Sequence, residues 1–380
     1  MERKLPFTQE HEMFRKTFRD FVENELVPHY EEWEKNSIVA RDAFKKMGDY
    51  GFLCNWVDEQ YGGSGADFLY DMIIMEEIGH RSLMGFFSPL HSAVVAPYIA
   101  SYANDEQKAL WLPGCVSGEK ILAVAMTEPG TGSDLAAIRT KAVKNGDYYI
   151  LNGSKTFISN GILADLIVVA AKTDPTAGAK GISLFVVERD TPGFERGQSI
   201  PKIGLHAQDT CELFFNDCRV PVDNLLGKEG AGFTYLMQKL QQERIVTCQG
   251  STCLAERALE LTIQYVKERQ AFGQPLSKFQ NTQFVLAECA SEVQIARTFT
   301  DALIADHMAH KDILQEVSMG KYWICETAHK VASRCLQLFG GYGYCSEYEI
   351  SRIFTDTRIK SIFAGTSEVM KVIVSRGLGL

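Results

Sequence analysis

The order of hydrophobic patterns along the chain is the feature that most restricts its fold. Apolar residues recur with helical spacing to about residue 120, short β-branched runs follow to about residue 231, and helical spacing then resumes. Alternating strands and helices would indicate a parallel sheet, and this chain has no such alternation. The order predicts an α+β multidomain protein, with an N-terminal α-helical domain over 1–120, a middle β domain over 121–231 and a C-terminal α-helical bundle over 232–380.

Helical and extended segments differ in their apolar spacing. Near the N-terminus, Phe14, Phe18 and Phe21 recur at steps of three and four residues, which places them on one face of a helix. From about Ile121 the apolar runs are short, and turn sequences such as Asn145-Gly146-Asp147 separate them. These runs predict a β-barrel or β-sandwich with strands at 121–126, 148–151, 165–171, 182–187 and 211–215.

The remainder of the chain has the periodicity of long helices. Four segments, at 233–269, 278–309, 311–339 and 366–376, carry this pattern. No Gly-x-Gly-x-x-Gly sequence follows a strand, so a nicotinamide-binding Rossmann unit is not supported. The chain also has no detectable internal repeat, which argues against a solenoid.

Composition excludes several classes of function. The 39 basic and 48 acidic residues give a formal net charge of −9, and an acidic surface argues against nucleic acid as the main partner. The ten cysteines show no spacing typical of zinc, so we expect no metal site and a reducing compartment. Early charges exclude a secretory signal, and no apolar run reaches the roughly 18 residues of a membrane span. We expect a cytoplasmic protein or a mature organelle matrix protein.

Two sequences in the middle domain have the composition of ligand-binding loops. The first, 126–134, combines Gly130 and Gly132, which let backbone approach a flat or anionic ligand, with the hydroxyls of Thr127 and Ser133. A plain hairpin turn is the alternative. The second, 151–161, is expected to begin a strand after an Asn-Gly turn at 152–153 and to present Phe157 and Ser159 on one face. Such a face could cover a planar ring, and the alternative is a core phenylalanine beside a surface serine.

Three further motifs lie in the C-terminal region. They are Arg269-Gln270-Ala271-Phe272-Gly273-Gln274-Pro275-Leu276, Gln337-Leu338-Phe339-Gly340-Gly341-Tyr342-Gly343-Tyr344 and Ile362-Phe363-Ala364-Gly365-Thr366-Ser367-Glu368-Val369. In the last of them, Thr366 or Ser367 is predicted to cap a helix, and the free N–H groups of a helix start favour phosphate. Each motif is weak evidence by itself.

Taken together and in this order, the five motifs closely resemble those of the acyl-CoA dehydrogenase family, from about residue 8 to residue 378. The resemblance implies a C-terminal four-helix bundle, FAD as cofactor and a homo-oligomer, as a dimer or a dimer of dimers (a homotetramer). It also implies a role in fatty acid β-oxidation. The implied reaction removes the pro-R α-proton of an acyl-CoA, transfers a β-hydride to flavin N5 and yields a trans-2-enoyl-CoA, with electrons passed to an electron-transfer flavoprotein.

The resemblance also implies roles for individual residues. Contacts with the flavin or the thioester are implied for Met126, Thr127, Gly132 and Ser133, and contacts with the flavin ring and its edge for Phe157 and Ser159. Contacts with the FAD of the neighbouring subunit are implied for Arg269, Phe272, Gln337 and Gly341, and contacts with the FAD pyrophosphate and adenosine region for Thr366 and Glu368. Substrate contacts are implied for Ser133, Arg244 and Arg376. The family often has Trp and Thr where this chain has Phe157 and Ser159. Because a charged Glu368 cannot bind phosphate without cost, we expect it to bind a hydroxyl, an amide or an arginine.

The catalytic base is the least obvious assignment. Many relatives carry a glutamate just before the Gly-Thr of the last motif, where this chain has Ala364, whose backbone N–H alone remains as an expected donor to the enolate oxygen. A branch that resembles isovaleryl- and long-chain-type dehydrogenases carries the base on the first helix of the bundle, and Glu243 matches that position. The alternative is a solvated Glu243 paired with Lys239 at i−4.

Two other functions remain open from the sequence. A flavin oxidase or monooxygenase would use the same scaffold, and a non-catalytic flavin- or CoA-binding relative would keep the fold. The acyl-chain length and its branched or aromatic character also stay open, although the resemblance favours the long-chain type. Candidate lining segments for the acyl group are 86–92 and 235–237, and His91 within the first is expected to be a packing or capping residue.

Overall fold

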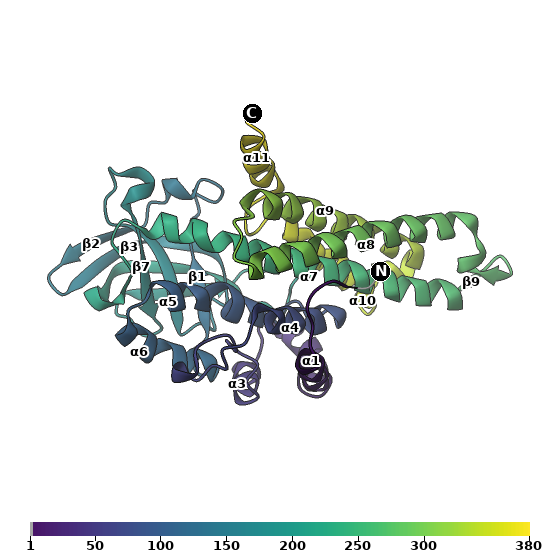
Figure 1. The fold of residues 1–380 in the computed structure, drawn as a ribbon, viewed down its shortest axis with the longest axis horizontal. Helices are drawn as coiled ribbons and strands as arrows, with labels where there is room; N and C mark the ends of the chain where they lie inside the picture. Colours follow the sequence, from purple (N-terminus) through teal and green to yellow (C-terminus); the bar gives the residue numbers. More distant parts are fainter. Residues whose placement is uncertain (1–2) are drawn as a thin grey trace.

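A computed structural model describes residues 3–380 of the chain. Figure 1 shows a sheet at one end of the molecule, a long helical bundle at the other and the N-terminal helices below both. The N-terminal helices are α1 (Gln9–Phe21), α2 (Val27–Asn36), α3 (Arg41–Asp49), α4 (Phe68–His80), α5 (Ala96–Tyr102) and α6 (Asp105–Val116). Two π-helical turns, η1 (Val22–Leu26) and η3 (Leu90–Val95), lead directly into α2 and α5. Both of these helices have proline in their first turn, and a wider turn accommodates a residue that has no N–H to donate.

The middle region forms an eight-stranded sheet in the order β6-β7-β3-β2-β4-β5-β8, with β1 paired parallel to β4. Its strands are β1 (Leu122–Ala125), β2 (Lys141–Asn145), β3 (Tyr148–Ser159), β4 (Leu166–Lys172), β5 (Ile182–Glu188), β6 (Phe194–Ser199), β7 (Thr210–Pro221) and β8 (Leu225–Leu226). The turn at 145–147 joins β2 to β3 as predicted. The turn expected at 152–153 is wrong, because Gly153 lies inside β3 at a register shift. A Cβ there would lie 2.5 Å from the Thr140 hydroxyl, so the bulge requires glycine.

The C-terminal region is helical, which confirms the predicted helical, β, helical order. Its helices are α7 (Gly232–Glu268), α8 (Gln280–Met308), α9 (Leu314–Phe339), α10 (Glu349–Arg358) and α11 (Ser367–Gly377). A small hairpin of β9 (Gln270–Ala271) and β10 (Gln274–Pro275) joins α7 to α8, and Figure 1 places β9 at the end of the bundle farthest from the sheet. Within residues 3–380, no helix is long and apolar enough to cross a lipid bilayer.

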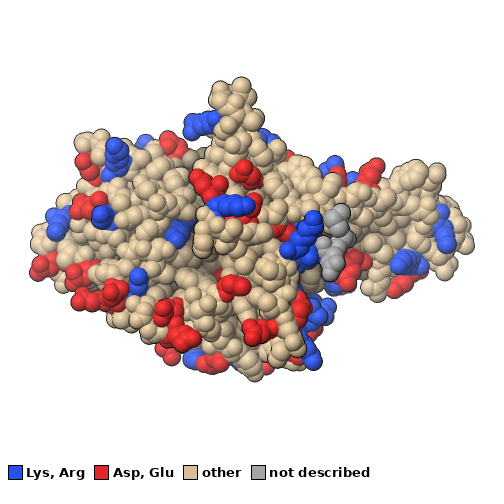
Figure 2. Space-filling view, viewed as in Figure 1, with Lys and Arg blue, Asp and Glu red and all other residues tan. Residues whose placement is uncertain are grey.

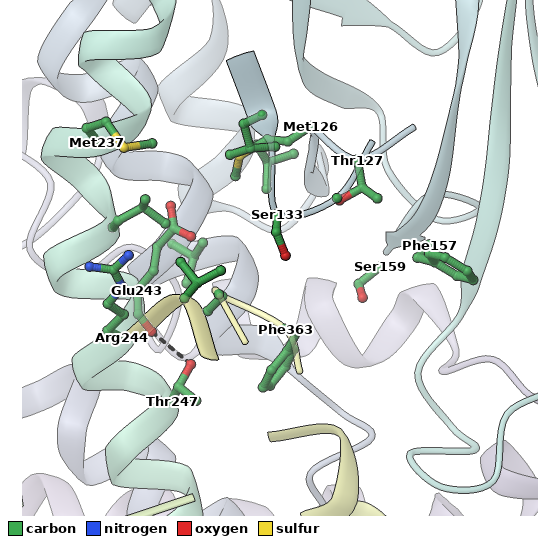
Figure 3. Close-up of a pocket in the computed structure, with 18 of the residues that line it drawn as sticks. Met126, Thr127, Ser133, Phe157, Ser159, Met237, Glu243, Arg244, Thr247 and Phe363 are labelled. Carbon is green, nitrogen blue, oxygen red and sulfur yellow. Dashed lines mark hydrogen bonds between the residues drawn. The ribbon is translucent and has the colours of Figure 1, made fainter. Parts of the chain in front are cut away.

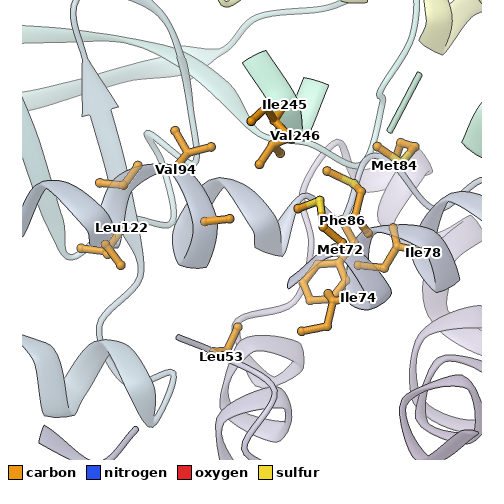
Figure 4. Packing of buried hydrophobic residues seen from close by; sticks show 14 of the residues in the cluster. Leu53, Met72, Ile74, Ile78, Met84, Phe86, Val94, Leu122, Ile245 and Val246 are labelled. Carbon is orange, nitrogen blue, oxygen red and sulfur yellow. The ribbon is translucent and has the colours of Figure 1, made fainter. Parts of the chain in front are cut away.

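One hydrophobic core joins the N-terminal helices to the bundle and to one face of the sheet. Figure 4 shows Met72 and Ile78 of α4 near Val246 of α7, with Val94 and Leu122 in the same cluster. A second cluster fills the sheet. Because the first cluster surrounds α7, that helix has a fixed position relative to η3 and β1, and those elements frame the site described below.

A network of buried charges ties the N-terminal segment to the bundle. Arg3 contacts Glu76 of α4 at 2.6 Å and Asp301 of α8 at 2.7 Å. Arg297 of α8 donates to both carboxylate oxygens of Glu256 at 2.7 and 2.6 Å, and its Nη1 lies 3.5 Å from Glu76. On the surface, acidic and basic side chains are interspersed over the face in Figure 2. The ion pairs of this network therefore lie inside the molecule, between α4, α7 and α8.

All ten cysteines are free thiols, as expected for packing residues. Nine of them are buried, and Cys345 is exposed at the end of the 3-10 segment η8 (Gly340–Tyr344).

Candidate active site

A cavity of about 380 Å³ opens where the sheet, α7 and the turn before α11 meet (Figure 3). Both middle-domain motifs, 126–134 and 151–161, contribute to its lining, and so do Glu243 and Arg244 of α7. The predicted site residues that line the cavity are Met126, Thr127, Gly132, Ser133, Phe157, Ser159, Glu243, Arg244 and Ala364. Phe87, Leu90, Val94, Phe233, Met237 and Leu240 add an apolar wall to it. The cavity therefore combines a polar side with a hydrocarbon-lined side.

Glu243 is the buried carboxylate of this cavity. The residue is 7% exposed, and its Oε1 accepts a hydrogen bond from the Tyr98 hydroxyl at 2.6 Å. Burial raises the pKa of Glu243 to about 7, although the Tyr98 hydrogen bond and the Arg244 charge act in the opposite direction. The alternative of a solvated residue paired with Lys239 is wrong, because the Lys239 ammonium donates to Ser101 at 2.6 Å.

Arg244, next on α7, is a second buried charge at the cavity. Its side chain is buried, and its Nη1 donates to Ser318 at 3.4 Å. Its Nε has no hydrogen-bond partner within residues 3–380. A buried N–H of this kind is costly without an acceptor, so a polar ligand atom in the cavity would stabilise the protein.

The two loop motifs are held together by a buried ion pair that sequence reasoning missed. Lys155 of β3 is fully buried, and its Nζ lies 2.9 Å from both Glu128 Oε1 and the backbone oxygen of Met126. Burial lowers the pKa of Lys155 to about 8, although the Glu128 carboxylate acts in the opposite direction. Both residues lie inside the motifs, and their opposite charges were the available signal.

A register shift in β3 turns Phe157 out of the sheet. The shift lies between Lys155 and Ile158, Phe157 has φ of 59°, and the residue is 65% exposed. Phe157 and Ser159 both reach the cavity, as their predicted common face requires. An exposed ring beside a hydroxyl, at the rim of a cavity, is an arrangement that fits a flat aromatic ligand.

The turn before α11 brings Ala364 to the cavity. Ala364 and Gly365 have φ of 52° and 98°, and the buried Lys321 of α9 donates to the Gly365 carbonyl at 2.5 Å. Thr366 is the N-cap of α11, as predicted, and accepts from the Val369 N–H at 3.3 Å. The turn faces α7 across the cavity, so position 364 and Glu243 address the same space.

Four predicted residues lie away from the cavity, at the far end of the bundle. Arg269, Phe272, Gln337 and Gly341 belong to the end of α7, the β9–β10 hairpin, the end of α9 and η8, respectively. Arg269 lies over the Tyr342 ring at 5.4 Å, and Phe272 is 95% exposed with φ of 52°. Figure 1 shows this end opposite the sheet, so one chain does not bring the two groups together.

The remaining predicted residues lie on α11. Glu368 is in its first turn and Arg376 in its last turn.

Three of the predicted site residues have a strained backbone. Phe157, Phe272 and Ala364 are non-glycine residues with φ in the left-handed region. Backbone strain of this kind persists where surrounding structure requires it, and it is common at ligand sites.

Fitting FAD to these residues requires a flat apolar contact, polar edge groups and room for backbone approach. Phe157 supplies the flat apolar contact, and Ser159 and Thr127 supply the polar edge groups. A Cβ built on Gly130 or Gly132 would meet no atom within 4 Å, so the loop is open on its ligand side. The residues present therefore fit the cofactor that the motifs imply.

Comparisons with known proteins cover nearly the whole chain. Models of the acyl-CoA dehydrogenase N-terminal, middle and C-terminal domains match residues 8–119, 123–218 and 230–379. The mitochondrial long-chain specific acyl-CoA dehydrogenase of Sus scrofa is 44% identical over 372 residues, covering 97% of this chain and 86% of the relative.

Solved structures give the same result. The crystal structure of acyl-CoA dehydrogenase from Geobacillus kaustophilus is 57% identical, with a TM-score of 0.98 and 100% coverage of both chains. A chain in a structure described as electron transferring flavoprotein of Acidaminococcus fermentans is 37% identical, with a TM-score of 0.93, covering 100% of this chain and 99% of that one. Family models that span most of the chain, together with these identities, show that it belongs to the acyl-CoA dehydrogenase family of FAD-dependent enzymes.

Proposed function

We propose that the enzyme converts an acyl-CoA thioester to the trans-2-enoyl-CoA, with the Glu243 carboxylate accepting the α-proton. The observation that carries the proposal is a buried carboxylate at a cavity where position 364 holds alanine. A base with a pKa near 7 is matched to proton abstraction near neutral pH. Bound FAD supplies the acceptor for the β-hydride. The Ala364 backbone N–H would donate to the thioester oxygen and stabilise the charge that develops on it.

The cofactor-binding residues are proposals of the same kind. Phe157 and Ser159 would contact the flavin ring and its edge, and the Met126–Ser133 loop would lie between ring and thioester. Thr366 and Glu368 at the start of α11 would hold the pyrophosphate and adenosine region. In support, Glu368 is exposed in the first turn of α11, at the helix end that favours anionic groups.

Assembly into a homo-oligomer, as a dimer of dimers, would complete the site. Arg269, Phe272, Gln337 and Gly341 lie too far along the bundle to meet the cavity of their own chain, and the exposure of Phe272 supports contact with a second copy. An electron-transfer flavoprotein is the proposed electron acceptor, and the likeness to a chain in a structure described by that name supports it.

The acyl group is proposed to lie along the apolar wall formed by Phe87, Leu90, Val94 and Met237. Arg244 and Arg376 are proposed substrate contacts, and Ser133 would address the thioester. An acyl chain that lies along this wall is expected to be apolar, because a charged group against hydrocarbon side chains would lack a partner there. The similarity to a long-chain specific relative favours a long straight chain.

Anaerobic titration of the FAD-loaded protein with acyl-CoA thioesters tests this function. We expect the flavin absorbance to bleach with apolar acyl groups, most completely with long straight chains, and to recover when electron-transfer flavoprotein is added. If the flavin absorbance recovers only when oxygen is added, and peroxide is released, the enzyme would instead be an oxidase. Absence of bleaching across short, long, branched and aromatic thioesters would contradict the proposal.

The pH dependence provides a separate prediction. At pH values below its pKa of about 7, Glu243 is mostly protonated and cannot accept the α-proton. We therefore expect kcat/KM to rise about tenfold per pH unit below pH 7 and to level off above it. Initial rates with one saturable acyl-CoA at constant ionic strength measure the profile. A profile that stays flat down to about pH 5 would indicate a carboxylate with an ordinary pKa and would contradict the assignment.

A further inference from the structure

Tyr98 is the one side chain that donates a side-chain hydrogen bond to Glu243 among residues 3–380. Its hydroxyl lies 2.6 Å from Glu243 Oε1, and no loop motif contains it. Tyr98 is fully buried on α5, behind the cavity rather than in its lining. The contact joins two elements that are 145 positions apart in the chain. Tyr98 therefore contacts the proposed base from outside the cavity lining.

The surrounding packing fixes the Tyr98 hydroxyl relative to α7. One turn along α5, Tyr102 stacks on Tyr235 of α7 with ring centroids 3.9 Å apart. The Tyr102 hydroxyl also donates to Gln238 Oε1 at 2.8 Å. Gln242 of α7 donates to the backbone oxygen of Ala93 at 2.7 Å. Contacts on both sides of Tyr98 therefore hold α5 against α7, and its hydroxyl has little freedom to follow Glu243 elsewhere.

We propose that Tyr98 is a positioning residue for the catalytic base: its hydroxyl holds Glu243 Oε1, so that the other carboxylate oxygen is the one presented to the α-proton. This inference rests on the proposed role of Glu243. A carboxylate on a two-methylene stem has several rotamers, and a single short hydrogen bond to a rigid donor selects one of them. Productive proton transfer requires the acceptor oxygen to be in reach of the proton, so the selected rotamer raises the fraction of competent complexes.

The same hydrogen bond stabilises the charged form of Glu243. Desolvation and the adjacent carboxylate raise the pKa of Tyr98 well above its ordinary value, so Tyr98 remains a donor throughout the working pH range. The other charge that acts on Glu243 is Arg244 on the same helix. Lys321 of α9 bonds the Gly365 carbonyl, and Lys239 bonds Ser101, so neither ammonium is a partner of Glu243.

The test compares pH profiles of kcat/KM for the FAD-loaded wild type and Tyr98→Phe. Loss of a charge-assisted hydrogen bond raises the pKa of the base, so we expect the acid limb to move up by about one pH unit. At pH 7 kcat/KM should fall about fivefold, because the ionised fraction of the base drops from about one half to about one eleventh. KM should be nearly unchanged, since Tyr98 does not line the cavity. Tyr102→Phe is the matched control, since it loses a hydroxyl on the same helix that bonds Gln238 instead, and its acid limb should coincide with the wild type.

A second replacement tests the opposite sign. Incorporation of 3-fluorotyrosine at position 98 keeps the shape of the ring and makes the hydroxyl a stronger donor, so the acid limb should move down in pH. A merely structural role predicts no movement in either variant. If the acid limbs of the pH profiles coincided for the wild type and both Tyr98 variants, the inference would be overturned. It would also be overturned if both variants moved the acid limb in the same direction. A wild type that does not bleach with any acyl-CoA would overturn the proposed function instead, which keeps the two failures distinct.

Discussion

Glu243→Gln is expected to lower the rate of acyl-CoA dehydrogenation by about 10³-fold while the protein still folds and retains FAD. Glutamine has the shape of glutamate but cannot accept the α-proton, and a positioned general base typically contributes 10²- to 10⁴-fold. The variant should still bind substrate, because the apolar wall and Arg244 are unchanged. Stopped-flow bleaching of the flavin under anaerobic conditions measures the rate of the chemical step directly.

A matched control separates the loss of the base from general effects of the substitution. Glu260 lies on the same helix, is exposed, and pairs with Arg257 at 2.9 Å. Glu260→Gln should therefore bleach at the wild-type rate. If Glu243→Gln kept near-full dehydrogenation, the base would have to be another group, and the raised pKa of Glu243 would have no catalytic meaning.

Arg297→Met is expected to lower the free energy of unfolding by about 3–5 kcal/mol, the largest effect on stability that we predict. Arg297 is 7% exposed and donates to Glu256 through two nitrogens and to Gln249 at 2.8 Å. Methionine fills much of the same volume but leaves the Glu256 carboxylate without its arginine partner, while Glu76 keeps Arg3 and Arg15. Urea unfolding of the FAD-loaded protein at fixed concentration measures the change.

An exposed ion pair on the neighbouring helix provides the comparison. Lys330 of α9 pairs with Glu292 of α8 at 2.9 Å, and its side chain is 63% exposed. Lys330→Met should cost less than about 1 kcal/mol, because the ammonium is largely solvated and Glu292 keeps Arg334 as a partner. Equal effects of Arg297→Met and Lys330→Met would mean that burial of the first pair does not determine its contribution.

Much of the fold follows from local pattern, and its failures have local causes. The three long bundle helices and the Asn145-Gly146-Asp147 hairpin were predictable because periodicity and turn chemistry act over a few residues. Helix α10 was missed, since among its apolar residues only Ile350 and Ile353 are buried, too few to establish a period. The Asn152-Gly153 pair was predicted to form a turn, as Asn-Gly pairs commonly do. It instead forms a bulge, because a side chain at position 153 would collide with Thr140 on a neighbouring segment, and that contact is not visible in the local sequence.

The candidate site divides in the same way. Residues within motifs, such as Ser133 and Phe157, were identified because each motif is continuous in sequence. The match of Glu243 to a family position gave its place but not its environment. Tyr98 could not be identified, because α5 carries no motif and its contact with Glu243 depends on how two distant helices pack. Long-range contacts of this kind come from tertiary packing and leave no periodic signal.

Cys345 is the single exposed thiol among the ten, and it follows η8 at the end of the bundle where Gly341 and Phe272 lie. A maleimide fluorophore added to the native protein would therefore attach at one place per chain without removal of the other cysteines. That attachment point is next to the surface proposed to meet a second copy. Energy transfer between differently labelled chains would then follow subunit exchange in real time, on the unmodified sequence.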